Sequence, residues 1–480
     1  MPFDDLTQFL QSASDAGELE RVEVELNPVE EIAAVTQEIG REFLQQSPVI
    51  YCERPFRSRI PVVTNLLGNR NRFLRSLGCS QLDEAVQRVI SAFNPFANLG
   101  NDWKRPLGTP TVADRSRIVP RVIRRAACQQ VVKLGQEINL LDLPVPTCWP
   151  GETHPAITAG LILTETAEGK PLVEQVPAAV LDRETLLIHW QPSHSGESQW
   201  RQAVAAQRPF PVAIALGGDP LLGYVASLPL PPQLNPWHLA GALRQESVNL
   251  IRARSVELNV PADAEIILEG YLDPAAPLQS GTIAGEQGVL ENHSNLPVLR
   301  LTAITHRANP IFPVKIHGFQ FQEAVVTSQL TERLLLQLLQ LLNPDVSDLH
   351  LPPCGGCRQT VFVSTNAASP DQIQQLFQAI GSLPGTAQAG LVVVVPSTVP
   401  LRNTDAVWRE VSLQFPNTSP EEVLPLAARG ERLWIDAASR KSGGWTGSGR
   451  CLSSEQVLSR IAARLGGDAS IPQTEQSTPL

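Results

Sequence analysis

Hydrophobic positions near the N-terminus recur first with the period of a helix and then with that of a strand. The apolar residues of segment 3–13 fall at helical spacing behind Asp4, a residue type that often caps helices. Segment 19–26 then alternates like a strand, and a second helix is predicted over 32–43 with Pro28 in its first turn. Short strands at 49–52 and 60–64 complete an α/β opening, and the Pro-, Gly- and Asn-rich stretch Asn94–Pro110 is typical of a linker.

The middle of the chain is rich in strand patterns. They span residues 157–164, 173–180, 185–190, 212–216, 264–271 and 298–305. Short turns such as Ala167-Glu168-Gly169 join consecutive strands, which indicates an antiparallel sheet or barrel. Within this region, Asn235 and Pro236 predict the start of a helix over 237–244, with Asn235 as its cap.

The last third begins with a helix pattern whose leucines cover nearly the whole circumference. This stretch, 328–342, must be buried on most sides, either within its own domain or against another subunit. Strand patterns at 361–364 and 391–395 enclose a helix pattern at 370–380, which predicts a β-α-β unit with a parallel strand pair.

Composition narrows the possible classes of protein. A chain of 480 residues exceeds one ordinary hydrophobic core, so we expect two or three domains. The formal charge of −10, with scattered basic residues, argues against a nucleic-acid partner. The N-terminus lacks the basic and apolar parts of a signal peptide, and apolar runs such as Leu391–Val395 cannot cross a bilayer, so we expect a soluble, cytoplasmic protein without a transmembrane segment. Seven widely spaced cysteines favour free thiols over a disulfide framework.

Several motifs, taken in order, resemble the UbiD family of decarboxylases. The most specific is INLLDLPVPTCWPGETHPAITAGLILTET, supported by VLDRETLLIHWQPSHSG, IALGGDP, VPADAEIILEGYLDP, LHLPPCGG and RLWIDAASRK. The opening LQSASDAGELERVEVELNPVEEIA is similar to the start of that family too. The resemblance therefore extends over essentially the whole chain.

The resemblance implies a mixed α+β protein of three parts. These are an N-terminal α/β domain (1–110), a central split β-barrel that binds flavin (111–322) and a C-terminal α/β domain (323–480). It also implies a homo-oligomer that removes CO₂, without oxidation, from a small aromatic or α,β-unsaturated acid, with a polyprenyl hydroxybenzoate quinone precursor among the candidates. The implied cofactor is prenylated FMN, an electron sink for the carbanion, held through its phosphate by manganese with potassium nearby.

The metal ligands of the family are an Asn, a His and a Glu, and only the His has a match here, at His194. A hydrogen-bonded histidine at a strand end is the alternative interpretation of that residue. The Asn position is occupied by Leu172 and the Glu position by Pro236, neither of which can ligate a metal. Glu174 and Asn235 lie within two residues of these positions and could rebuild a site after small register shifts, but the favoured interpretation is solvent exposure for Glu174 and helix capping for Asn235.

The catalytic group of the family is an Arg between two acids, which stabilises negative charge and protonates the product carbon. The Arg position is Pro177 and the first acid position is Ser280. Only the second acid has a counterpart, Glu286, which is otherwise a surface residue in a Gly-rich loop.

Flavin contacts match better. Thr158 and Ala159 fall on the strand that in the family runs beside the isoalloxazine, and Lys441 occupies the position of a family Lys near the flavin. A solvated loop lysine is the alternative for Lys441. Asp219, in a Gly-Gly-Asp-Pro run, is interpreted as a turn residue rather than a ligand.

Three functional hypotheses follow. The first is a working decarboxylase with an altered site. The second is a catalytically impaired paralogue that serves as a binding or assembly partner, which the replacements Leu172, Pro177, Pro236 and Ser280 favour. The third is a thiol-redox protein, and it rests on Cys354 and Cys357 alone. A structural zinc site is not expected at these two cysteines, because no second pair of ligands follows at zinc-finger spacing.

Overall fold

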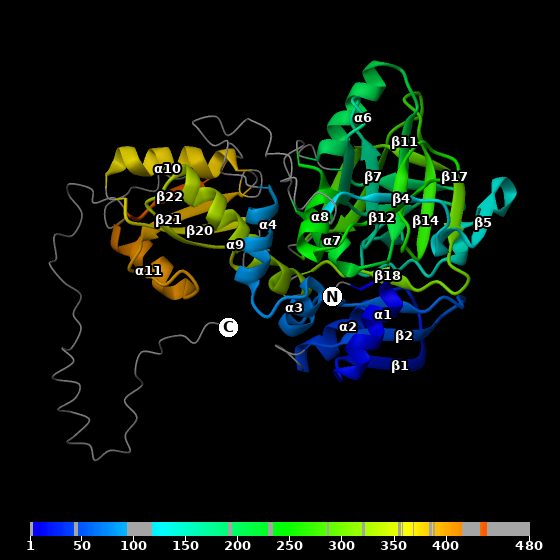
Figure 1. Cartoon of the computed structure of the whole chain (residues 1–480), viewed down its shortest axis with the longest axis horizontal. Coiled ribbons are helices and arrows are strands. Elements are labelled where there is room, and N and C mark those ends of the chain that lie inside the picture. Colours follow the sequence, from blue (N-terminus) through cyan, green and yellow to red (C-terminus); the bar gives the residue numbers. More distant parts are fainter. Residues whose placement is uncertain are drawn as a thin grey trace, which may run out of the picture.

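The computed structural model describes residues 3–42, 47–93, 118–190, 194–228, 234–285, 288–318, 322–353, 357, 359–367, 369–383, 386, 389–414 and 433–438. It confirms the mixed α+β class. Figure 1 shows a small N-terminal sheet below a large central sheet, with a C-terminal sheet set apart and the long helix α9 between them. The linker expected at Asn94–Pro110 lies outside the described residues.

The first sheet has the order β1-β2-β3-β18. Its strands are β1 (Leu19–Leu26), β2 (Val49–Pro55), β3 (Val62–Thr64) and β18 (Phe312–Val314), and the accompanying helices are α1 (Leu6–Asp15), α2 (Glu31–Glu42), α3 (Arg70–Leu77) and α4 (Leu82–Phe93). Because β18 comes from far along the chain, residues 1–110 do not complete this sheet alone.

Two predicted details of these helices are wrong. Asp5, not Asp4, caps α1, since its carboxylate accepts the N–H of Gln8 at 2.9 Å. Pro28 precedes α2 rather than lying in its first turn, because the helix begins at Glu31.

The central sheet has the order β6-β9-β10-β17-β14-β11-β7-β8, with β5 added beside β17, and every pairing in it is antiparallel. Its strands are β5 (Val131–Leu134), β6 (Ala156–Ile157), β7 (Leu161–Glu165), β8 (Pro171–Gln175), β9 (Ala178–Val180), β10 (Thr185–Ile188), β11 (Phe210–Leu216), β14 (Ile266–Leu272) and β17 (Val298–His306). The predicted antiparallel arrangement is confirmed.

Two of the predicted strands are each broken in the middle. The segment 157–164 is interrupted at residues 158–160, and the segment 173–180 at 176–177. Pro177 has no N–H to give to a strand ladder, so β8 and β9 separate there. Ala159, in the first break, and Gln175, just before the second, both line one pocket.

Smaller elements complete the central part. They are a sheet of β4 (Arg121–Ile123), β12 (Asn249–Arg252) and β13 (Asn259–Pro261), the hairpin β15 (Gln279–Ala284) and β16 (Leu290–Leu296), 3₁₀ turns at Ala127–Gln129, Gly135–Glu137 and Leu140–Asp142, and helices α6 (Ser195–Ala205), α7 (Pro220–Ser227) and α8 (Pro236–Arg244). The predicted cap of α8 is confirmed, because the Asn235 side chain accepts the N–H groups of Trp237 and His238.

The C-terminal sheet has the order β19-β20-β21-β22 and contains the predicted β-α-β unit. Its elements are α9 (Gln322–Leu342), β19 (Val346–His350), β20 (Thr360–Thr365), α10 (Pro370–Ser382), β21 (Leu391–Pro396), α11 (Thr404–Gln414) and β22 (Leu433–Asp436). Helix α9 contacts α3, α4, α10 and β19, so its leucines are largely covered within the chain, and Leu341 remains exposed. The leucine run thus gives no separate support for a second subunit.

No described helix combines the length and apolar character needed to cross a membrane.

Candidate functional site

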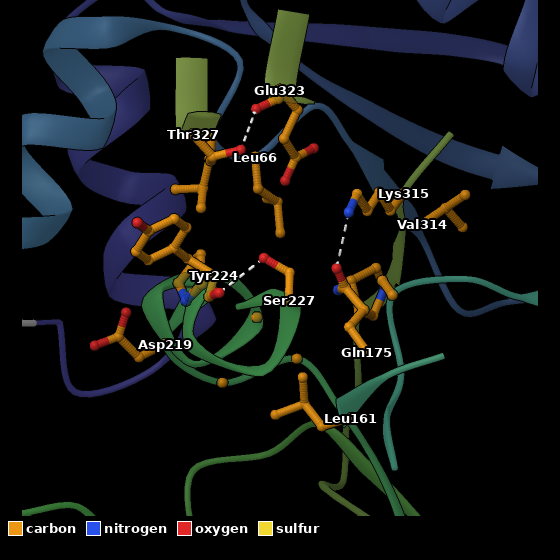
Figure 2. A pocket seen from close by; sticks show the side chains of 17 residues that line it. Leu66, Leu161, Gln175, Asp219, Tyr224, Ser227, Val314, Lys315, Glu323 and Thr327 are labelled. Carbon is orange, nitrogen blue, oxygen red and sulfur yellow. Dashed lines mark hydrogen bonds between the residues drawn. The ribbon is translucent and has the colours of Figure 1, made fainter. Parts of the chain in front are cut away.

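A pocket lies where α7, the end of β8, the segment after β18 and the start of α9 meet (Figure 2). It encloses about 50 Å³, which is room for a few water molecules or one small polar group. Ala159 lines the pocket, together with Leu66, Leu161 and the side chains of Gln175 and Lys315. Ala159 is the residue that the resemblance places beside the flavin, and the sequence gave no sign of Lys315.

Helix α7 enters the pocket through a turn that only glycine allows. Gly217 and Gly218 have positive φ angles of 75° and 88°, and a Cβ on Gly217 would lie 2.4 Å from Cγ of Glu265. Asp219 follows as the cap of α7, where its carboxylate accepts the N–H of Leu221 at 2.9 Å. Its other oxygen accepts from Arg244 at 2.5 Å, so Asp219, predicted as a turn residue, is a buried helix cap paired with an arginine.

Lys315 and Gln175 form the polar side of the pocket. The ammonium group of Lys315 donates to Oε1 of Gln175 at 3.0 Å, and Figure 2 shows the two side chains pointing toward each other. The backbone N–H of Lys315 donates to the hydroxyl of Thr158 at 3.2 Å, which places Thr158 directly behind this wall.

Helix α9 closes the opposite side with Glu323 and Thr327. Burial raises the pKa of Glu323, and Lys315 and Arg72 oppose the rise. The polar side chains among the lining residues are one ammonium group, two carboxyl groups, one amide and three hydroxyls, namely Lys315, Asp219, Glu323, Gln175, Tyr224, Ser227 and Thr327. This donor set suits a polar or anionic group held between apolar walls.

The residues considered as metal ligands lie at the starts of α6 and α8 and on β8. His194 is the residue that precedes α6, and its side chain does not cap the helix. Glu174 does so instead, because its carboxylate accepts the N–H groups of Ser195 at 2.7 Å and Gly196 at 3.1 Å. Burial raises the pKa of Glu174, and these two bonds oppose the rise.

The other positions considered for the metal site lie on β8 and at the start of α8. Leu172 is buried on β8, Pro236 is the first residue of α8, and Asn235 is committed to capping that helix. Within the described residues, no group of three or more His, Cys, Asp or Glu side chains is arranged to hold a metal ion. The solvent exposure expected for Glu174 is wrong, since the residue is half-buried and bonded to α6.

A buried group of charges lies behind the glycine turn. Arg307 bonds Asp5 of the N-terminal α1 cap at 2.8 Å and lies 3.6 Å from Glu265. Burial raises the pKa of Asp219 to about 6 and that of Glu265 to about 7, each opposed by its neighbouring arginine. These charges tie the first sheet to the central one.

Histidines gather around strand β15, a feature that sequence reasoning missed. His189 follows β10, is 3% exposed and stacks edge to face on His293 with ring centroids 5.3 Å apart. Burial, then His293 and His154, lower the pKa of His189 to about 4. His293 lies 3.2 Å from the carboxylate of Glu291 through Nε2. The two-residue spacing of Glu291 and His293 on a strand was the available signal, since it puts both on one face.

The remaining residues that the sequence singled out either lie outside the described part of the chain or do not line the pocket. Glu286, Lys441 and Cys354 lie outside the described residues. Ser280 is on β15, and the carbonyl of Pro177 accepts the N–H of His189 at 3.0 Å. The cysteines that the structure describes, among them Cys357, form no disulfide with one another.

Comparisons with known proteins agree over most of the chain. Three family profiles match, namely the N-terminal (10–89), Rift-related (121–319) and C-terminal (325–418) domains of UbiD, 3-octaprenyl-4-hydroxybenzoate carboxy-lyase. An uncharacterized protein of Aquifex aeolicus is 34% identical over 377 residues, which are 76% of this chain and 75% of that protein.

Solved structures share the fold at lower identity. Vanillic acid decarboxylase of Sedimentibacter hydroxybenzoicus in its closed form has a TM-score of 0.78 at 22% identity, covering 97% of this chain and 100% of that one. An evolved dimeric form of the UbiD-class enzyme HmfF of Pelotomaculum thermopropionicum, in complex with prFMN, has a TM-score of 0.72 at 22% identity, covering 95% and 98%. The apo 3,4-dihydroxybenzoic acid decarboxylase of Klebsiella pneumoniae has a TM-score of 0.70 at 19% identity, covering 96% and 99%.

Proposed function

Since the chain belongs to the UbiD family, we propose that it is a carboxy-lyase that removes CO₂, without oxidation, from a small aromatic or α,β-unsaturated acid. The observation that carries the proposal is the pocket beside Ala159, where polar side chains meet apolar walls next to the segment that the family places beside its flavin. A polyprenyl hydroxybenzoate is one candidate substrate.

A flavin suits the described residues, and prenylated FMN would supply an electron sink for the carbanion left by CO₂. Lys315 and the hydroxyl of Ser227 would hold its polar groups, and Leu66 and Leu161 would contact apolar parts. Helix α7 and the start of α9 border this space from two sides. Figure 2 shows these two helices as facing walls of the pocket.

Manganese and potassium do not fit the described residues. Glu174 and Asn235 are bonded to the starts of α6 and α8, and Leu172 and Pro236 have no donor atom. We therefore assign no catalytic role to a metal ion and propose that charge on the flavin phosphate is balanced by Lys315.

The second candidate function is that of a catalytically impaired paralogue, a binding or assembly partner. The engagement of Glu174 and Asn235 in helix caps favours it, because it removes the residues that could have rebuilt the metal site. In either case we propose a cytoplasmic homo-oligomer that does not bind nucleic acid. Light scattering at micromolar protein that detects only the monomer would contradict the oligomer.

One experiment separates the two functions. The protein is purified from cells that also make the prenyl-flavin synthase, its absorbance spectrum is recorded, and CO₂ release is followed with hydroxybenzoic, dihydroxybenzoic and cinnamic acids. A carboxy-lyase binds flavin and releases CO₂, at up to about 1–10 s⁻¹ for an ordinary enzyme. Bound flavin without CO₂ release from any acid would support the impaired paralogue.

A further inference from the structure

The pocket beside Ala159 holds an acidic side chain close to its ammonium group. Glu323 lies in the first turn of α9, and Figure 2 shows its carboxyl group pointing into the pocket, toward the end of Lys315. The two groups are near enough for the charge of Lys315 to favour the ionised form of Glu323. Lys315 also donates to Oε1 of Gln175 at 3.0 Å, which holds its ammonium group at the wall of the pocket. Glu323 and Lys315 therefore share one small space.

The charge state of Glu323 depends on a balance that a bound anion disturbs. Burial is the largest influence and raises the pKa of Glu323, because it removes water from the carboxylate. Lys315, then Arg72 and a hydrogen bond from the backbone of Leu67, oppose this rise. An anion that pairs with Lys315 shares the strongest of these opposing influences and adds a second negative charge to the pocket. The neutral, protonated form of Glu323 is then favoured.

The polar groups around Glu323 come from five parts of the chain. They are Lys315 after β18, Arg72 on α3, Gln175 at the end of β8, Asp219 and Tyr224 of α7 with its cap, and Thr327 on α9 itself. Arg72 is committed to the backbone carbonyls of Ser47 and Asn65, and Asp219 is paired with Arg244. Among the described residues that line the pocket, Lys315 is the only cation. No second cation in this lining can neutralise Glu323 once an anion has paired with Lys315.

We propose that Lys315 and Glu323 form a subsite for an oxyanion of the ligand, a phosphate or a carboxylate, and that Glu323 binds it as the neutral acid. The inference rests on the proposed function, in which the cofactor carries a phosphate and the substrate a carboxylate. The ammonium group of Lys315 pairs with the anion, and the O–H of Glu323 donates a hydrogen bond to it. Glu323 takes its proton from water as the anion binds, and no covalent bond changes in the ligand. The enclosed space of about 50 Å³ suits one such group.

Proton uptake gives this subsite a characteristic dependence on pH. Because the anion raises the pKa of Glu323 further, the complex keeps a proton that the free protein loses at higher pH. Affinity is therefore full where Glu323 of the free protein is already protonated. It falls as pH rises above the pKa of that group, by up to about tenfold per pH unit for one proton. A ligand that lacks the oxyanion takes up no such proton.

The test measures ligand binding to the full chain by isothermal titration calorimetry between pH 6.5 and 8.5. The probes are FMN, riboflavin, which lacks the phosphate, and 4-hydroxybenzoate. Parallel titrations in two buffers of different ionisation enthalpy count the protons taken up, and the wild type is expected to take up as much as one per bound oxyanion. Uptake with FMN but not with riboflavin identifies the flavin phosphate as the occupant, and uptake with 4-hydroxybenzoate identifies the substrate carboxylate.

Glu323→Gln isolates the proton of Glu323. Glutamine keeps an N–H donor for the anion and an oxygen for the backbone of Leu67, but it cannot ionise. At pH 8.5 this variant should bind the same probe at least about tenfold more tightly than the wild type. It should take up no proton beyond that of a phosphate probe itself, which titrates at about pH 6. The matched control Glu257→Gln, whose carboxylate is 86% exposed and outside the pocket lining, should bind like the wild type at each pH.

The outcomes separate the subsite from the proposed function. Equal proton uptake by the wild type and Glu323→Gln, with matching melting temperatures, would overturn the role of Glu323 and leave the carboxy-lyase proposal standing. Binding with the expected proton uptake but without CO₂ release from any acid would support the subsite and overturn the carboxy-lyase. A wild type that binds none of the three probes would overturn both.

Discussion

The substitution Glu265→Gln isolates the energetic cost of a buried charge beside the glycine turn of α7. Glu265 is 1% exposed, one carboxylate oxygen accepts the N–H of Ile311 at 3.1 Å, and the other has no hydrogen-bond partner among the described residues. Arg307 lies 3.6 Å away and is itself bonded to Asp5. Glutamine keeps the bond to Ile311 and removes the charge.

The magnitude follows from the proton affinity of this carboxyl group. Burial raises the pKa of Glu265 from 4.5 to about 7, so the folded protein holds the proton more tightly than the unfolded chain does. The stability that this group contributes is fully present below pH 4.5 and is lost as pH rises to 7, a change of about 3 kcal/mol. Near pH 8 the variant should be the more stable protein by up to about that amount.

The assay is thermal unfolding of wild type and variant from pH 4.5 to 8.5. For a unit the size of the central sheet, we expect the variant to melt higher by about 6–12 °C at pH 8, with little difference at pH 4.5. Glu257→Gln, an exposed carboxylate, is the matched control and should follow the wild type at every pH. The reasoning is refuted if Glu265→Gln melts at or below the wild type at pH 8, or if the difference between the two proteins does not change with pH.

Three further outcomes are expected. Lys315→Met should weaken flavin binding at least about tenfold, measured by fluorescence titration with FMN, because it removes the ammonium group of the pocket, while Lys170→Met in an exposed turn should not. Manganese should not co-purify in stoichiometric amount, and retention of one equivalent after dialysis, measured by mass spectrometry, would show that the ligands were misplaced. Glu174→Ala should destabilise the protein by about 1–2 kcal/mol in urea unfolding, because two N–H groups of α6 lose their acceptor, and an unchanged midpoint would contradict this.

The sequence was sufficient to predict those structural features that depend on interactions between residues close together in the chain. The cap at Asn235, the β-α-β unit over β20, α10 and β21, and the antiparallel character of the central strands depend on neighbouring residues, periodicity and short turns. The motif order was also sufficient to predict the family. Asp4 and Asp5 are the same residue type at adjacent positions, so local patterns could not show which of the two caps α1.

The site itself was decided by contacts between residues far apart in the chain. Gln175 meets Lys315 across 140 positions, and the His189 ring meets His293 only because β10 and the β15–β16 hairpin lie side by side. The sequence predicted that Glu174 is either a solvent-exposed side chain or a replacement metal ligand, because only its nearness to Leu172 in the chain could be seen. In the fold, the start of α6 lies against the Glu174 carboxylate. Periodicity shows which face of an element is buried, but which partner covers that face depends on strand register and on packing of the whole core.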